Sequence, residues 1–287
     1  MMALRLTLTV SIALIVAQPL MARPLLTEEV PTIGKKAFET TFSISERRDK
    51  FNTPESTYRS VNFPFSARFG LSRSLDLGLY LLLVNHRLET PEAQYSGSNN
   101  GRISPFLKFS PWDYMGLMVI YHGKNTEEIE QELPIGFGKD WEFRTLFKMP
   151  TFWPISFNIN YVMRGAYDSK FGVRNPVPRT VRPGNIFETR GAVEIPLKHH
   201  FSILGEMAYY SAEKSTIQGV EVANSSAEAM DGLIGLTWSY FNWYLSAGAA
   251  VGLLDEKDTS FNLERGAGDG MIKLSVTYRL TPKKTTP

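Results

Sequence analysis

Alternation of apolar and polar residues is clearest between Val61 and Leu83. Both halves of this stretch carry an apolar side chain at every second position, and a short polar connection (70–74) separates them. Successive side chains on a strand point to opposite faces, so each half is predicted to be a strand with one apolar and one polar face. Each half is about ten residues long, the length that a tilted strand needs to cross a bilayer. The pattern fits a membrane hairpin, but it also fits one layer of a soluble sandwich. The pattern in the rest of the chain is needed to distinguish these two structures.

The same alternation recurs along the whole chain. We predict twelve strands, at about 38–45, 61–69, 75–83, 102–109, 117–121, 137–148, 155–164, 188–195, 201–210, 231–239, 243–251 and 272–280. The connections alternate between short turns and long polar loops, which include 46–56, 85–100 and 211–228. Outer-membrane barrels show this asymmetry, with short periplasmic turns, longer extracellular loops and an even strand number. The predicted fold is therefore all-β: a closed antiparallel transmembrane β-barrel of about 12 strands.

Two features leave the strand number open between 10, 12 and 14. The sequence Gly138-Lys139-Asp140 is able to form a tight turn that splits the sixth strand, and two later strands are weakly patterned. Aromatic residues support the barrel, because they gather beside the predicted turns and loop ends, as the two interfacial girdles of a membrane barrel do. Examples are Trp112, Tyr114 and Trp243 near short turns, and Tyr121 near a long loop.

Composition excludes several classes of function. The chain of 287 residues has a formal net charge of +2 and no cysteine. Nothing therefore points to a nucleic-acid partner, a disulfide framework or a thiolate metal site. Residues 1–22 resemble a signal peptide, with Arg5 before a short apolar run that Pro19 ends. We predict export to the outer membrane of a Gram-negative cell, a periplasmic or lumenal lead (23–35), a barrel (36–280) and a basic tail (281–287).

Charged residues of both signs occupy the polar face of the predicted strands. Charges that face lipid are costly at mid-membrane, so these side chains are predicted to line the lumen. The candidates are Glu39, Arg68, Asp76, Arg102, Lys108, Glu142, Arg144, Arg164, Glu188, Arg190, Glu194, Glu206, Lys273 and Arg279. Charge rings of this kind filter solutes in an open pore, whereas in a filled lumen opposite charges pair and hold the strands together. Both interpretations remain open.

Catalytic and metal-binding signals are weak. An enzyme in this architecture needs a histidine beside a serine near the outer rim. Only His86 and His122 lie toward the predicted extracellular ends of strands, and neither stands in a recognisable motif. His199 and His200 lie in a predicted short turn, and no histidine–carboxylate spacing suggests a metal site. We predict no enzyme, no metal and no cofactor, with an envelope lipid-modifying enzyme as a distant third hypothesis.

Three short motifs resemble a bacterial family, the outer-membrane transporters of the meta-pathway of phenol degradation. The region from Arg23 to Glu39 resembles the opening of that family and contains the acidic pair Glu28-Glu29 after a threonine. The stretch Gly70 to Gly78 (GLSRSLDLG) resembles the next hallmark, and Ser104-Pro105 the strand after it. The resemblance implies a barrel of twelve or so strands and passage of small hydrophobic or aromatic compounds. It identifies no binding residue.

Two functional hypotheses follow. The first is a passive outer-membrane channel for small solutes, including hydrophobic or aromatic compounds. The second is a structural or adhesive barrel with a plugged lumen. The expected partners are outer-membrane lipid and lipopolysaccharide, the barrel-assembly machinery during insertion, and a small-molecule solute.

Overall fold

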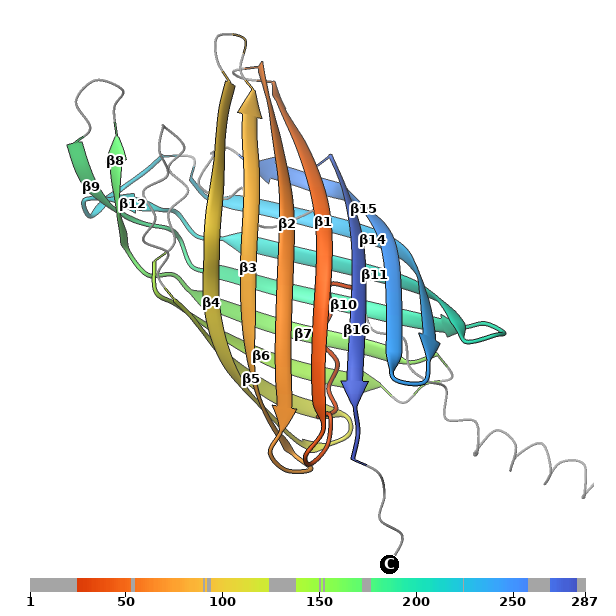
Figure 1. Cartoon of the computed structure of the whole chain (residues 1–287). Coiled ribbons are helices and arrows are strands. Elements are labelled where there is room, and N and C mark those ends of the chain that lie inside the picture. Colours follow the sequence, from red (N-terminus) through yellow and green to blue (C-terminus); the bar gives the residue numbers. More distant parts are fainter. Residues whose placement is uncertain are drawn as a thin grey trace, which may run out of the picture.

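The barrel closes through its first and last strands. A computed structural model describes residues 25–52, 55–89, 91, 94–123, 138–149, 151, 153–171, 177–223, 225–257 and 269–282. Strand β1 (Phe38–Asn52) pairs antiparallel with both β2 (Glu55–Gly70) and β16 (Gly270–Leu280), and twelve strands form the closed barrel in Figure 1. The predicted closed antiparallel barrel of twelve strands is confirmed. The predicted signal peptide lies outside the described residues.

The other barrel strands follow one another around the wall by antiparallel pairing. They are β3 (Leu75–Glu89), β4 (Gln94–Trp112), β5 (Met115–His122), β6 (Asp140–Met149), β7 (Ile155–Met163), β10 (Ile186–Pro196), β11 (Phe201–Ala212), β14 (Ala227–Tyr240) and β15 (Trp243–Lys257). Closure gives every strand two hydrogen-bonded neighbours, which a lipid-exposed backbone requires. Among the described residues, no helix is long and apolar enough to cross a membrane.

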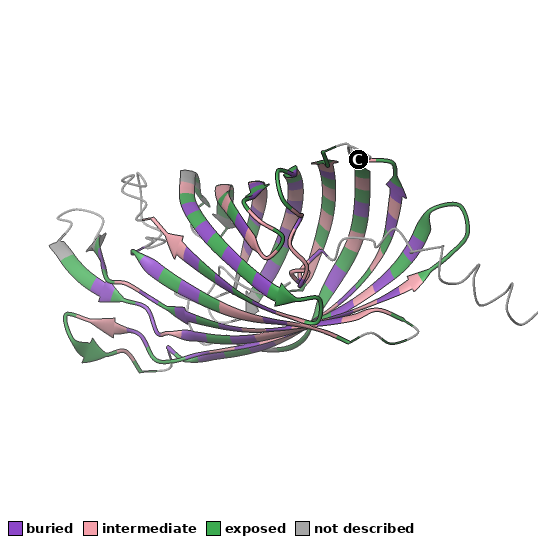
Figure 2. Cartoon of the chain, turned by 90° about the horizontal axis from the view of Figure 1, so that it is seen from below, coloured by how far each residue is buried: buried purple, intermediate pink, exposed green. Residues whose placement is uncertain are grey.

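Burial alternates along the strands, as Figure 2 shows. The outward positions are apolar and exposed, for example Phe42, Leu77 and Leu274, whereas the positions between them are buried and mostly polar. This is the reverse of a soluble protein, because the apolar surface faces outward, toward lipid. The alternation of apolar and polar residues that predicted the strands therefore shows which side of each strand faces lipid.

The two ends of the barrel differ. At one end, called here the turn end, β2 joins β3 through residues 71–74, β4 joins β5 through 113–114, and β14 joins β15 through 241–242. Strand β1 begins and β16 ends at the turn end. The opposite end, called here the loop end, carries the longer connections.

The predicted loops at 46–56 and 85–100 are wrong. Strands β1 and β2 continue through most of 46–56, and β3 and β4 continue through most of 85–100, so that this side of the barrel extends farther at the loop end (Figure 1). The outward side chains of these extensions, such as Arg48 and Lys50 on β1, are polar and exposed, so the backbone ladder continues without apolar alternation. Within the predicted loop 211–228, β12 (Thr216–Ile217) and β13 (Val220–Glu221) join β8 (Tyr167–Phe171) and β9 (Val177–Arg182) in a separate four-stranded sheet.

The turn between β10 and β11 is built from residues that are unfavourable in it. His199 and His200 have φ of 58° and 67°, and the Phe201 amide donates to the Lys198 carbonyl across the turn at 3.4 Å. Positive φ at both central positions is the mark of a type I′ turn, for which Asn-Gly is the preferred pair. Each L-residue in this conformation costs about 1–2 kcal/mol.

Replacing His199-His200 by Asn-Gly is therefore expected to stabilise the barrel. The gain in free energy of unfolding should be about 1 kcal/mol, after allowing for the lost edge contact between His200 and Tyr240, whose ring centroids lie 5.8 Å apart. Urea unfolding of the refolded barrel measures this gain in free energy of unfolding. Lys198→Ala is the neighbouring control, because it leaves both positive-φ residues in place. A loss of stability in the Asn-Gly variant would contradict this account.

Candidate functional site

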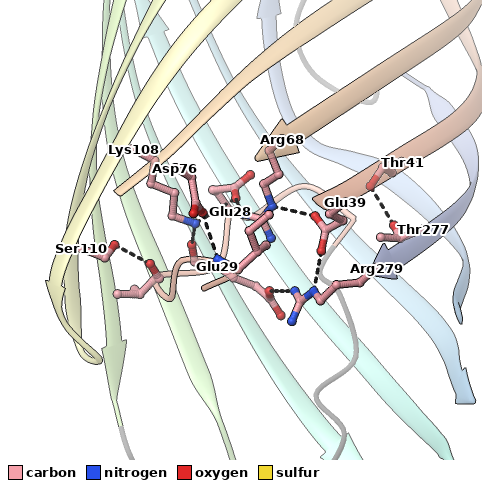
Figure 3. A network of polar contacts seen from close by, with 12 residues as sticks. Glu28, Glu29, Glu39, Thr41, Arg68, Asp76, Lys108, Ser110, Thr277 and Arg279 are labelled. Atoms are coloured by element: carbon pink, nitrogen blue, oxygen red, sulfur yellow. Dashed lines mark hydrogen bonds and ion pairs between the residues drawn. The ribbon is translucent and has the colours of Figure 1, made fainter. Parts of the chain in front are cut away.

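Residues 25–33, ahead of β1, run inside the barrel. This segment, called here the plug, includes the buried side chains Leu25, Val30 and Ile33. The plug contacts inward-facing residues from several strands, among which Figure 3 shows Asp76, Lys108 and Ser110. Val30 packs in a cluster with Phe106 and Leu146, and Leu25 packs in another with Leu204. A segment with no regular secondary structure is thus held on apolar contacts within a mostly polar lumen.

The tip of the plug is bound through its backbone. The Glu206 carboxylate on β11 accepts hydrogen bonds from the amides of Leu25, Leu26 and Thr27 at 2.5, 2.9 and 2.8 Å. Lys273 donates to the Leu25 carbonyl at 2.5 Å, and Arg190 donates to the Leu26 carbonyl. Hydrogen bonds to a charged partner are about twice as strong as neutral ones. Three inward-facing charges therefore fix a short stretch of main chain.

The acidic pair Glu28-Glu29 is bound through its side chains. Glu28 lies 3.2 Å from the Lys108 ammonium and 3.3 Å from the Arg68 guanidinium, and it accepts a hydrogen bond from the Tyr80 hydroxyl. Lys108 also donates to the Glu29 carbonyl, as Figure 3 shows. The glutamate at position 28 therefore neutralises two buried cations from two different strands.

The plug leaves the lumen through a close contact between two glycines. Gly34 has φ +93°, which favours glycine, and the Lys36 amide donates to the Gly70 carbonyl at 2.7 Å. A Cβ added to Gly70 would lie 1.7 Å from the Gly34 carbonyl oxygen. Just before this point, the Ile33 amide donates to Asp76 at 3.0 Å. Gly70 and Asp76 belong to the GLSRSLDLG stretch, so the first two resemblance motifs pack against each other.

Buried charges of the barrel wall are paired. Glu39 accepts from Arg68 at 2.6 Å and from Arg279 at 2.7 Å, and Arg279 also lies 3.7 Å from Glu29 of the plug (Figure 3). On the far side, the Glu188–Arg190 pair is 2.5 Å apart. The pairs of Glu39 join β1 to its two neighbouring strands, and the contact of Arg279 with Glu29 ties the wall to the plug, whereas Glu188 and Arg190 belong to the same strand, β10.

None of the fourteen predicted lumen residues is exposed. Nine are buried and five are intermediate. Asp76, Lys108, Glu206 and Lys273 bind the plug, in addition to the residues paired above. Arg102 and Arg164 share Asp140, which the sequence did not single out, and the Arg164–Asp140 distance is 3.0 Å. Glu194 is buried on β10.

A cavity of about 470 Å³ extends from the plug toward the loop end. Its walls come from ten of the barrel strands, and Leu25 to Glu28 of the plug lie at its border. Apolar and aromatic residues such as Tyr58, Leu82 and Phe106 alternate there with guanidinium groups such as Arg144. This size and mixed lining are typical of small-molecule sites.

Three polar residues at the cavity wall form a chain that the sequence did not reveal. His122 Nδ1 lies 2.9 Å from the Ser104 hydroxyl, and His122 Nε2 lies 2.9 Å from a Glu142 oxygen. The three residues stand on the neighbouring strands β4, β5 and β6. Their spacing in the sequence follows no motif, and only the strand register brings them together. The one signal in the sequence for this chain of residues was that its members occupy inward positions near a predicted rim of the barrel.

Comparison with known proteins identifies the fold. No family model matches the chain, and no curated protein matches its sequence. An outer membrane channel from Pseudomonas putida F1 has a TM-score of 0.70 at 11% identity, over 91% of this chain and 100% of that one. The chain has the fold of an outer-membrane barrel.

Two autotransporter domains are also similar to the barrel. The β-domain of BrkA from Bordetella has a TM-score of 0.53 at 10% identity, over 86% of this chain and 100% of that one. The translocator domain of NalP from Neisseria meningitidis has a TM-score of 0.52 at 10% identity, over 86% of this chain and 89% of that one. At such identities the likeness concerns architecture alone.

Proposed function

We propose that the barrel is an outer-membrane channel for passive uptake of small solutes, including hydrophobic or aromatic compounds, and that the plug narrows its lumen. The lumenal cavity carries this proposal, because a barrel wall that served only as a scaffold would have no need of a space of about 470 Å³ lined by both apolar and charged side chains. The resemblance to transporters of phenol degradation supports the same class of solute. The similar barrel from Pseudomonas putida F1 is itself described as a channel.

The character of the cavity favours small and partly apolar solutes. Tyr58, Leu82 and Phe106 offer apolar surface, while the adjacent guanidinium groups are paired with carboxylates. An ion entering this space would compete with existing pairs, whereas a neutral aromatic molecule needs only the apolar surface. The proposal includes the setting predicted from the sequence: an outer-membrane location with lipid and lipopolysaccharide around the barrel, and insertion by the barrel-assembly machinery.

The alternative is a structural or adhesive barrel. The observation that favours it is the plug, because residues 25–33 fill part of the lumen and are bound by Glu206, Lys108 and Asp76. The two functions differ in one measurable property, which is whether solutes cross the folded barrel.

Single-channel recording in a planar bilayer tests the channel. We expect small, steady openings from the chain that begins at Arg23, and openings several-fold larger from a variant that lacks residues 25–33. Phenol or benzoate should reduce the current through both. The variant serves as the control, because it shows whether the wall alone encloses a path. A silent bilayer with both proteins, at verified insertion, would exclude the channel and leave the structural barrel.

A further inference from the structure

We propose that Ser104, His122 and Glu142 form a hydrolytic triad that cleaves carboxylic esters entering the cavity. The proposal rests on two hydrogen bonds of 2.9 Å that join the serine to the histidine and the histidine to the glutamate. A nucleophile, a base within hydrogen-bond reach and an acid that orients the base are the geometric signature of nucleophilic catalysis, whatever the fold.

The strand register creates this arrangement. Phe106 pairs with Ile120, and the Gly123 amide donates to the Ile103 carbonyl at 3.0 Å, so the same register places Ser104 opposite His122. Ile120 in turn pairs with Glu142 on β6. All three residues occupy inward positions, where a shift of one residue would turn the side chains to lipid. The triad is thus held by the rigid wall rather than by a loop.

The hydrogen bonds fix which histidine nitrogen is basic. The second oxygen of Glu142 accepts from Arg144 Nε at 2.7 Å, so this carboxylate is ionised and acts only as an acceptor. His122 Nε2 must then carry the hydrogen that points to Glu142. In the neutral ring Nδ1 is left with its lone pair, which accepts the hydroxyl hydrogen of Ser104. This is the tautomer that a general base requires.

The triad faces a space that admits a substrate. Ser104, His122 and Glu142 all line the cavity, and Ser104 is 3% exposed, so its hydroxyl is reached from the lumen and not from the outer face. The rings of Tyr80 and Phe106 stand beside Ser104 with centroids 4.7 Å apart and offer a surface for an apolar acyl chain. Arg102 and Arg144 line the same cavity, and a developing oxyanion would share their guanidinium groups with their carboxylate partners Asp140 and Glu142.

The reaction is a two-step ester hydrolysis. Ser104 Oγ attacks the carbonyl carbon while its proton passes to His122 Nδ1, and the ester C–O bond then breaks as that proton moves to the leaving alkoxide. The released alcohol leaves an acyl group on Ser104. A water molecule that gives its proton to His122 attacks this acyl group, and Ser104 regains its proton as the carboxylic acid departs. Glu142 stays ionised and holds the imidazole.

Labelling with a fluorophosphonate probe tests the triad, because the probe modifies activated serines. In the refolded full barrel we expect about one adduct per chain, on the tryptic peptide 103–108, in which Ser104 is the one serine. Ser104→Ala should abolish the adduct. His122→Ala should slow its formation at least about a hundredfold, the usual contribution of a general base. Hydrolysis of p-nitrophenyl butyrate should fall in parallel.

Ser202→Ala is the matched control, because Ser202 is a similarly buried, inward-facing serine on β11 that does not line the cavity, and the variant should label at the wild-type rate. Glu142→Gln provides a second test, because it keeps the size of the side chain while weakening the orientation of His122, and should slow labelling by tenfold or more. Heat-modifiable migration in a gel verifies that each variant is folded. An unlabelled peptide 103–108 in the folded wild-type barrel, or equal rates with and without His122, would overturn the proposal and leave these residues as a structural hydrogen-bond chain.

Discussion

Replacing Glu206 by alanine is expected to free the tip of the plug. The carboxylate accepts three backbone hydrogen bonds from Leu25, Leu26 and Thr27. Hydrogen bonds to a charged group contribute about 1.5–3 kcal/mol each. Loss of two or more of them should shift the balance between the bound and the released plug at least about a hundredfold.

A single introduced cysteine reports on this shift. The chain has no cysteine of its own, and Thr27 is 5% exposed, so Thr27→Cys should react slowly with a water-soluble maleimide in the otherwise wild-type barrel. Adding Glu206→Ala should speed this reaction about a hundredfold and raise the single-channel conductance toward that of the variant without residues 25–33. Glu228→Ala, which removes an exposed carboxylate from β14, is the control and should change neither. Unchanged cysteine reactivity in Glu206→Ala would show that apolar contacts of the plug suffice to hold it.

The barrel could be predicted from the sequence because lipid imposes a strict pattern on it. Each strand needs an apolar outer face and no strand edge can remain open, so alternation such as that of β2 and β3 defines both the strands and their closure. The prediction failed where lipid ends. In β1 beyond Glu46 and in β3 beyond Asn85 the outward side chains are polar and exposed, and residues that pattern reasoning assigns to loops continue the ladder.

The plug and its site could be predicted only in part. Inward charges such as Glu206 and Lys108 were recognised because they alternate with lipid-facing residues. Their partners in the plug were not recognised, because the segment from Leu25 to Ile33 has no periodicity. The hydrogen bonds at its tip go to main-chain atoms that every residue type carries. The Ser104–His122–Glu142 hydrogen-bond chain could not be predicted for a related reason, because it depends on the register of three strands.

Loss of the Glu39 charge is expected to destabilise the whole barrel. Glu39 is 2% exposed and joins Arg68 on β2 to Arg279 on β16, so its carboxylate links the two strands that flank β1. Removing one partner from a buried ionic group leaves uncompensated charge and costs about 3–5 kcal/mol. In Glu39→Gln two guanidinium groups lose their shared carboxylate, and the carboxylates that remain near them, Glu28, Glu29 and Asp76, are more distant at 3.3 to 3.9 Å.

Urea unfolding of the refolded Glu39→Gln barrel should therefore show a loss of about 3–5 kcal/mol in the free energy of unfolding. Glu46→Gln is the matched control on the same pair of strands, because Glu46 lies 2.7 Å from Arg59 but both side chains are about half exposed. An exposed pair of this kind contributes about 0.2–1 kcal/mol. Adding Arg279→Gln to Glu39→Gln should recover part of the loss, because one partly buried guanidinium that has lost its nearest carboxylate disappears with it. Equal small losses in Glu39→Gln and Glu46→Gln would mean that water in the cavity screens the buried charges, and that the wall is held by its backbone ladder alone.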